Sequence, residues 1–139
     1  MNRMMRMMSV MVCLAALTAC SKAAPDQSAA AAVRVNGLEV GRTLGAGKAI
    51  ADKTSEFRPA DTIYLSVETD GTGPQTTLAA RWTYQDGQVV KEQTEAIAPA
   101  GNAYTEFHIS KPDGWPVGKY SVAVSLNGAA AGSRDFVVK

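Results

Sequence analysis

The sequence of 139 residues has few sulfur-containing and few aromatic side chains, and neither kind is spread evenly. It contains one histidine and two cysteines, no methionine after Met11, and no aromatic residue before Phe57. Its 14 basic and 13 acidic residues nearly balance, which gives no electrostatic reason to expect nucleic acid as a partner. The uneven distribution predicts a leader segment followed by one domain.

The N-terminal segment has the layout of a secretory signal. Arg3 and Arg6 precede an apolar run at residues 7–19. A run of this length falls short of the roughly 20 residues that a membrane-spanning helix needs. We therefore expect residues 1–19 to be removed as a signal peptide, which leaves 12 basic and 13 acidic residues in the mature chain.

The end of this segment, Leu17-Thr18-Ala19-Cys20, resembles the lipobox of bacterial lipoproteins. The resemblance implies lipid attachment to the Cys20 thiol, cleavage before it and acylation of the new amino group. Because Cys13 leaves with the signal, no free thiol or disulfide is expected in the mature chain. Ser21, in place of Asp, favours sorting to the cell outer membrane. The alternatives are an ordinary signal peptide cut near Ala19, or a cytosolic protein with an apolar start.

The chain after the lipidation site divides into a tether and a domain. Residues 20–32 contain the acylated cysteine followed by small and polar residues, with no aromatic or β-branched side chain that could build a core. Fully extended, twelve residues span about 40 Å at most. We expect this flexible tether to hold a single domain, residues 33–139, near the membrane.

The domain is expected to consist of strands, because its apolar residues recur every second position and turn residues separate the runs. Asp86-Gly87 and Asn127-Gly128 predict hairpin turns, the first with positive φ at both central residues. A short edge strand is expected around residues 48–51. The remaining strands are expected at 33–40 (or as a short hairpin there), 61–69, 77–84, 89–94 as a polar edge, 104–109, 120–126, and a last strand in which Phe136 and Val138 point inward.

About seven short strands without a helical apolar period predict an all-β fold, a single antiparallel β-sandwich. Gly118-Lys119-Tyr120-Ser121-Val122 resembles a tyrosine corner, and Trp82 lies centrally in the third expected strand. The domain therefore resembles the immunoglobulin-like and fibronectin-like group, without the disulfide of antibody domains. Residues 61–64 and 111–116 are also similar to segments of an uncharacterised lipoprotein family, which implies no known activity.

Motifs for catalysis or metal binding are weak. In the loop Gly41–Ala49, Gly41 and Gly47 are separated by five intervening residues instead of the four of a phosphate-binding loop, and Ala49 replaces its hydroxyl. His108 is the only imidazole, so a zinc site would need carboxylates as its other ligands. Glu106 shares a strand face with His108, either as a pH-sensitive pair or as solvated surface. We expect no cofactor, no metal and no catalytic residue.

The expected function is a non-enzymatic interaction or envelope-accessory module on the outer membrane. Its partners would be membrane lipid, through Cys20, and an envelope protein. Trp115 lies in a loop and is either a binding anchor or a plug at one end of the sandwich. The alternative is a small-ligand or glycan binder that uses Trp115 with Tyr104 or Tyr64. A hydrolase is the third hypothesis, and its catalytic base would have to be His108. The candidate binding residues are therefore Trp115, Tyr104 and His108.

Overall fold

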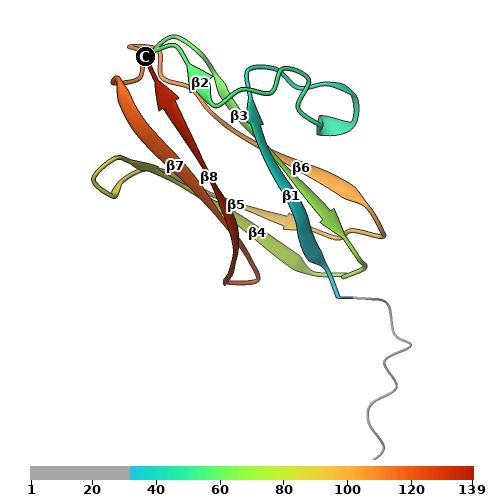
Figure 1. Cartoon of the computed structure of the whole chain (residues 1–139). Coiled ribbons are helices and arrows are strands. Elements are labelled where there is room, and N and C mark those ends of the chain that lie inside the picture. The colour runs from blue at the N-terminus through green and yellow to red at the C-terminus, as the bar shows by residue number, and fades with distance from the viewer. Residues whose placement is uncertain (1–31) are drawn as a thin grey trace, which may run out of the picture.

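The computed structural model describes residues 32–139. The expected signal peptide, Cys20 and the tether up to residue 31 lie outside the described residues. Eight strands form two facing sheets (Figure 1), and within residues 32–139 no helix is long and apolar enough to cross a membrane. The elements are β1 (Arg34–Gly41), the 3₁₀ turn η1 (Ala46–Lys48), β2 (Glu56–Phe57), β3 (Ile63–Asp70), β4 (Thr76–Tyr84), β5 (Gln88–Ile97), β6 (Ala103–Ile109), β7 (Gly118–Leu126) and β8 (Ala129–Val138).

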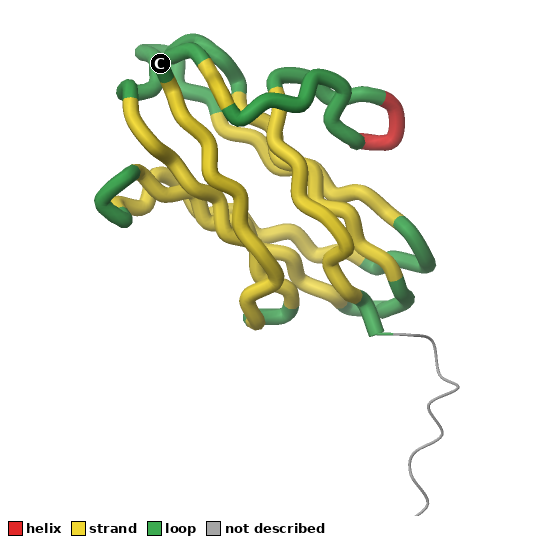
Figure 2. The backbone as a smooth tube through the Cα atoms, viewed as in Figure 1, coloured by secondary structure: helices red, strands yellow, loops and turns green. Residues whose placement is uncertain are grey.

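The two sheets have the orders β1-β3-β6 and β2-β8-β7-β4-β5, so the predicted β-sandwich is confirmed (Figure 2). The segment at 33–40 is one strand with an irregularity between Val35 and Gly37, not a hairpin. The additional strand, β2, is parallel to β8, and its Phe57 is almost completely buried. A strand of two residues has no measurable sequence period, which is why the sequence predicts about seven strands.

The core lies between the sheets, where alternate side chains of each strand point inward. Ile63, Leu65 and Val67 of β3 are fully buried, as the sequence predicts. Across from them Trp82 is also fully buried, with its ring centroid 6.0 Å from that of Phe136 in a T-shaped arrangement. This aromatic contact uses the geometry that ring quadrupoles favour, so the core is fixed by shape as well as by apolar area.

Tyr120 has the hydrogen bond of a tyrosine corner. Its hydroxyl donates to the carbonyl oxygen of Pro116 at 2.8 Å, four residues upstream. Tyr84, on the neighbouring strand, donates in the same way to the carbonyl oxygen of Val117 at 2.8 Å. Burial raises the pKa of the Tyr120 hydroxyl, and the nearby Tyr84 adds to this effect. The two tyrosines thus hold the start of β7 and the loop before it.

The prediction of an edge strand around residues 48–51 is wrong. The chain forms η1 there, and only an isolated bridge joins Leu44 to Ile50. Gly47, with φ of +69°, lets the backbone turn tightly where a strand would need extended residues. The Ser66 hydroxyl donates to the carbonyl oxygen of Lys48 at 2.8 Å. This hydrogen bond fastens the loop onto β3.

The two hairpin turns differ. Asn127 and Gly128, where a hairpin turn was expected, both have positive φ. In the turn after Tyr84 only Gly87 does, so the expectation for Asp86 is wrong. The reason is the register: Tyr84 faces Gln88, which leaves a three-residue loop that needs left-handed backbone only at its last residue.

Candidate functional site

The side of the sandwich between β5 and β6 is open, because each strand is the last of its sheet in the described chain. Three successive hollows of about 310, 630 and 410 Å³ follow this side, starting from the end at which β1 begins. Each is lined by residues of β5 or its end together with residues of β6 or the loop after it. We call this surface the lateral groove; it is bordered by residues 88–99 and 103–116.

All three binding residues predicted from the sequence border this groove. Tyr104 lines the first hollow, His108 the middle one and Trp115 the last. They do not converge on one point: Tyr104 and His108 are four residues apart on β6, which is about 13 Å along a strand. The arrangement suits an elongated ligand better than a compact one.

Trp115 is mostly buried, with 7% of its surface exposed, and it belongs to the core cluster. Its ring packs against Tyr120 with centroids 6.2 Å apart, and its indole N–H donates to the carbonyl oxygen of Asp61 at 3.1 Å. These contacts are those of a plug at one end of the sandwich. Trp115 also lines the last hollow.

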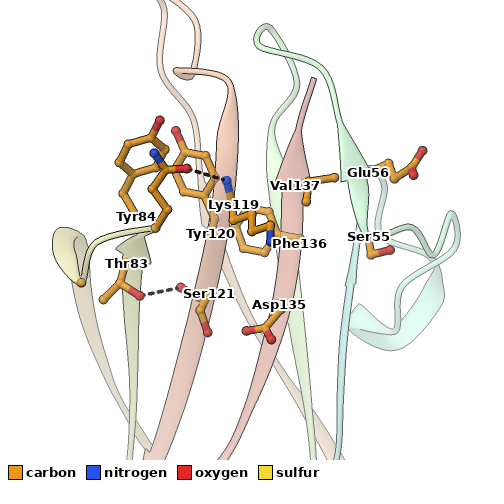
Figure 3. A pocket seen from close by; sticks show the side chains of 12 residues that line it. Ser55, Glu56, Thr83, Tyr84, Lys119, Tyr120, Ser121, Asp135, Phe136 and Val137 are labelled. Atoms are coloured by element: carbon orange, nitrogen blue, oxygen red, sulfur yellow. Dashed lines mark hydrogen bonds between the residues drawn. The ribbon is translucent and has the colours of Figure 1, made fainter.

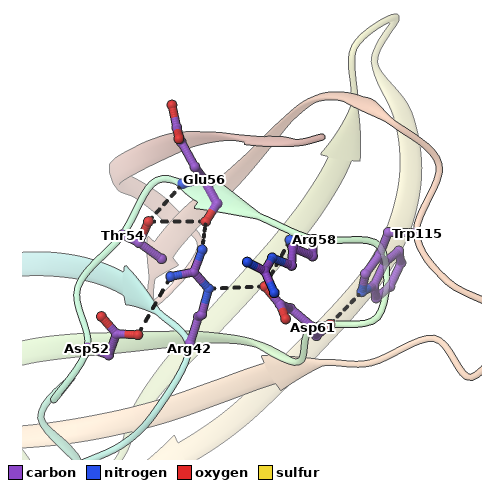
Figure 4. Close-up of polar contacts among 7 residues, drawn as sticks. All are labelled: Arg42, Asp52, Thr54, Glu56, Arg58, Asp61 and Trp115. Atoms are coloured by element: carbon purple, nitrogen blue, oxygen red, sulfur yellow. Dashed lines mark hydrogen bonds and ion pairs between the residues drawn. The ribbon is translucent and has the colours of Figure 1, made fainter.

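A polar cluster positions Trp115 (Figure 4). Asp61 Oδ2 accepts hydrogen bonds from the Arg58 backbone N–H at 2.8 Å and from Arg42 Nε at 3.1 Å. The backbone hydrogen bond from Arg58 is the main cause that lowers the pKa of Asp61; burial opposes it, and Arg42 adds to the lowering. The backbone N–H of Trp115 donates to the carbonyl oxygen of Pro59 at 2.7 Å. The segment at residues 58–61 therefore fixes the loop that carries Trp115.

The segments at 61–64 and 111–116, which the sequence singles out together, are in contact through this cluster. The signal was their common similarity to an uncharacterised lipoprotein family, and the sequence alone does not show which atoms of the two segments meet. Arg42 was missed because it lies in a glycine-rich loop without a pattern. Its guanidinium also donates to the carbonyl oxygen of Glu56 at 2.7 Å and lies 3.7 Å from Asp52.

The middle of the groove contains the Glu106–His108 pair. His108 Nδ1 contacts Glu106 Oε1, and the His108 ring lies 5.5 Å from that of Tyr64. The imidazole is exposed on the outer face of the three-stranded sheet. Among residues 32–139 no group of three or more His, Cys, Asp or Glu side chains could hold a metal ion.

Gln93, which the sequence reasoning missed, joins the two sheets across the groove. Its Oε1 accepts the Trp82 indole N–H at 2.9 Å, and its Nε2 donates to the carbonyl oxygen of His108 at 3.1 Å. A buried indole N–H needs an acceptor, so the polar strand beside Trp82 was a usable signal. Gln93 thus provides a hydrogen-bond donor for the His108 carbonyl oxygen at the edge of β6. The outer edge of β5 has no neighbouring strand within the described chain.

A second concave surface lies on the outer face of the five-stranded sheet (Figure 3). It has a volume of about 600 Å³ and is bordered by Thr83, Lys119, Ser121 and Asp135 among others. The Thr83 hydroxyl donates to the carbonyl oxygen of Ser121 at 3.4 Å. Its lining combines polar side chains with the aromatic residues Tyr84, Tyr120 and Phe136, and none of the three binding residues predicted from the sequence lies there.

No family model and no curated protein sequence matches this chain. Among solved structures, an immunoglobulin-like protein from Pseudomonas aeruginosa is 16% identical with a TM-score of 0.55, covering 78% of this chain and 98% of that one. An alkylpurine DNA glycosylase from Pseudomonas fluorescens is 17% identical with a TM-score of 0.53 over 77% of this chain. This chain spans only 30% of that glycosylase. The domain is thus an immunoglobulin-like β-sandwich, and at these identities the likeness concerns the fold alone.

Proposed function

We propose that this protein is a non-enzymatic, lipid-anchored interaction module of the bacterial outer membrane. Cys20 would hold the immunoglobulin-like domain at the membrane, and the lateral groove would bind a protein partner. The observation that supports this function best is the groove itself: three successive hollows along the two strands that end their sheets in the described part of an immunoglobulin-like domain.

Strand edges bind extended protein segments through main-chain hydrogen bonds, while side-chain hollows next to the edge give specificity. β5 offers ten residues of edge, and the three hollows are spaced along its length. Val89 and Tyr104, which border opposite ends of the groove, are 41% and 38% exposed. Large side chains exposed at a concave surface are typical of sites that a partner covers.

The anchoring part of the proposal is tested by replacing the modified cysteine. Cys20→Ala should move the protein from the membrane fraction to the soluble fraction, because two or three acyl chains are lost. Cys13→Ala is the matched control, since that residue would leave with the signal and its loss should not change the location. Retention of the Cys20→Ala protein in outer membranes would contradict lipid anchoring.

The groove is tested by photo-crosslinking in cells. A photoreactive amino acid at position 89 or 104 should capture the same envelope protein, whereas one at Lys119, on the outer face of the five-stranded sheet, should capture none. Capture from Lys119 alone would place the interaction elsewhere and contradict the groove.

A second function, binding of a small ligand or glycan, has one observation in its favour. The last hollow, about 410 Å³, is within the size range of ligand pockets and is lined by Tyr84, Trp115 and Tyr120. Titration with cell-wall sugars should then change tryptophan fluorescence, and Val89→Glu should abolish the change while Thr77→Glu, outside the groove, preserves it. An unchanged fluorescence at saturating sugar excludes this class of ligand.

A further inference from the structure

We propose that the partner bound at the β5 edge is a second copy of this chain. The two β5 strands would pair antiparallel about a two-fold axis that passes through Gln93, joining the two five-stranded sheets into one. This inference rests on the proposed function, because it names the partner of the lateral groove.

The edge of β5 is regular enough to accept another strand. Residues 91–97 pair with β4 without interruption, and the irregularity of this pair lies beyond them, next to the turn. Lys91, Gln93 and Glu95 face the buried Trp82, Ala80 and Leu78 of β4 in this register, so they lie on the side of the strand that faces the groove. Lys91 and Glu95 are exposed there.

When β5 pairs antiparallel with a second β5, basic residues of one strand can face acidic residues of the other. With Gln93 facing Gln93 of the second copy, Lys91 of each chain faces Glu95 of the other, on the groove side of the joined sheet. Beyond these pairs Val90 faces Ala96, and Glu92 faces Thr94 on the opposite side. Unlike charges directly opposite each other stabilise an antiparallel pair.

Neighbouring registers lack this complementarity. A shift by one residue in one direction places Glu92 opposite Glu95, and a shift by two in the other direction places Glu92 opposite Glu92. Like charges facing each other destabilise a strand pair. Charges on an edge also repel unrelated strands, so the same residues that protect β5 from aggregation favour pairing with itself in one register.

Charge reversal tests this pairing with the full chain extracted from membranes in detergent, using sedimentation velocity. Lys91→Glu and Glu95→Lys should each weaken self-association by roughly tenfold, because two attractive pairs become repulsive. The double variant should associate like the wild type. A mixture of the two single variants should form heterodimers, since one chain then carries two acidic and the other two basic residues. Glu92→Lys, which faces Thr94, is the matched control and should leave association unchanged.

Cysteine crosslinking tests the axis in intact membranes. Gln93→Cys places two thiols opposite each other, with Cα atoms about 4.5–5.5 Å apart, a distance that a disulfide spans. We expect an oxidised dimer on a non-reducing gel from this variant, and none from Thr77→Cys on β4. Should Gln93→Cys fail to accumulate, the charge-reversal series measures the same pairing without altering Gln93.

A wild-type chain that is monomeric in detergent and uncrosslinked through position 93 in membranes would overturn the inference. So would single charge reversals that associate as strongly as the wild type. If photo-crosslinkers in the groove then capture a different envelope protein, the proposed function stands without self-pairing. If they capture only a second copy of this chain while the β5 variants behave as expected, self-pairing stands and the groove has no other protein partner.

Discussion

On each long side of the sandwich, a side-chain hydrogen bond joins the two sheets, but one side has more additional contacts than the other. On the side between β1 and β8, Arg134 Nε donates to the carbonyl oxygen of Leu38 at 2.6 Å. On the side between β5 and β6, Gln93 Nε2 donates to the carbonyl oxygen of His108 at 3.1 Å. In both cases a side chain of the five-stranded sheet crosses to an edge carbonyl of the three-stranded sheet.

The β1–β8 side adds further contacts to this bridge. Glu39 Oε1 lies 3.9 Å from Arg134 and 3.7 Å from Lys53, and the loop between β1 and β2 returns over Gly41. That side has a hollow of about 390 Å³, but charged side chains that pair with one another line it. The β5–β6 side relies on Gln93 and keeps its edges accessible. The β1–β8 side is therefore the closed flank of the sandwich, and the β5–β6 side is the open flank.

On the closed β1–β8 flank, we expect the largest loss of stability from a substitution at Gly41. A Cβ atom there would lie 2.2 Å from the carbonyl oxygen of Asp52 and 2.3 Å from Ile50 Cγ2, so the loop would have to move away from β1. We expect Gly41→Ala to lower the free energy of unfolding by about 3 kcal/mol. Chemical denaturation measures this, with Gly45→Ala as control because its Cβ would meet only ordinary contacts. Equal stability of the two variants would mean that the loop is not held against β1.

On the open β5–β6 flank, we expect the largest loss of stability from removal of the Gln93 side chain. Gln93→Ala leaves the Trp82 indole N–H and the His108 carbonyl oxygen without their side-chain partner, which costs about 2 kcal/mol. Thr94→Ala, on the other face of β5, is the control and should change stability by less than about 0.5 kcal/mol. Denaturant melts followed by tryptophan fluorescence report both the stability and the environment of Trp82. A Gln93→Ala protein as stable as Thr94→Ala would show that water replaces the amide fully.

Loss of Arg134 should have a smaller effect than loss of Gln93, because the closed flank has other contacts. Arg134→Gln removes the hydrogen bond to Leu38 and should lower stability by about 1 kcal/mol. Hydrogen exchange of β1 amides should increase while that of β6 amides stays unchanged. An increase in β6 instead would mean that the two flanks are coupled through the core, and the comparison between them would fail.

The fold could be read from the sequence wherever one face of a strand is buried. The alternation of Ile63, Leu65 and Val67 and the position of Trp82 gave the inward faces correctly, because burial requires a period of two. The glycine-rich loop before β2 could not be read in this way. Its shape depends on contacts such as Ser66 with Lys48, between residues far apart in the sequence.

The candidate site could be predicted only in its parts. Tyr104, His108 and Trp115 were selected as the aromatic and ionisable residues outside the expected core, and they all border the groove. The groove itself follows from which strands end each sheet, and strand order is a property of the tertiary structure. The anchor at Cys20 lies outside the described residues and stays a prediction from the sequence.

An effect no larger than that of Arg134 is expected at Asp61, whose carbonyl oxygen accepts the indole N–H of Trp115 at the plugged end of the sandwich. The hydrogen bond from the Arg58 backbone, supported by Arg42, keeps the pKa of Asp61 below its ordinary value despite partial burial. The charged carboxylate therefore stabilises the fold above the unfolded-state pKa of about 3.9, and this contribution is lost as the pH falls through the lower folded-state value. Asp61→Asn should lower stability by about 1 kcal/mol at pH 7.

The difference between this variant and the wild type should shrink as the pH falls through the folded-state pKa of Asp61, because the wild-type carboxyl group then becomes protonated as well. Urea denaturation at a series of pH values measures this convergence. Asp113→Asn, in the exposed part of the same loop as Trp115, is the control and should match the wild type throughout. A constant gap between Asp61→Asn and the wild type at all pH values of the series would mean that Asp61 acts through shape and not charge, and that burial of Trp115 alone holds this end of the groove.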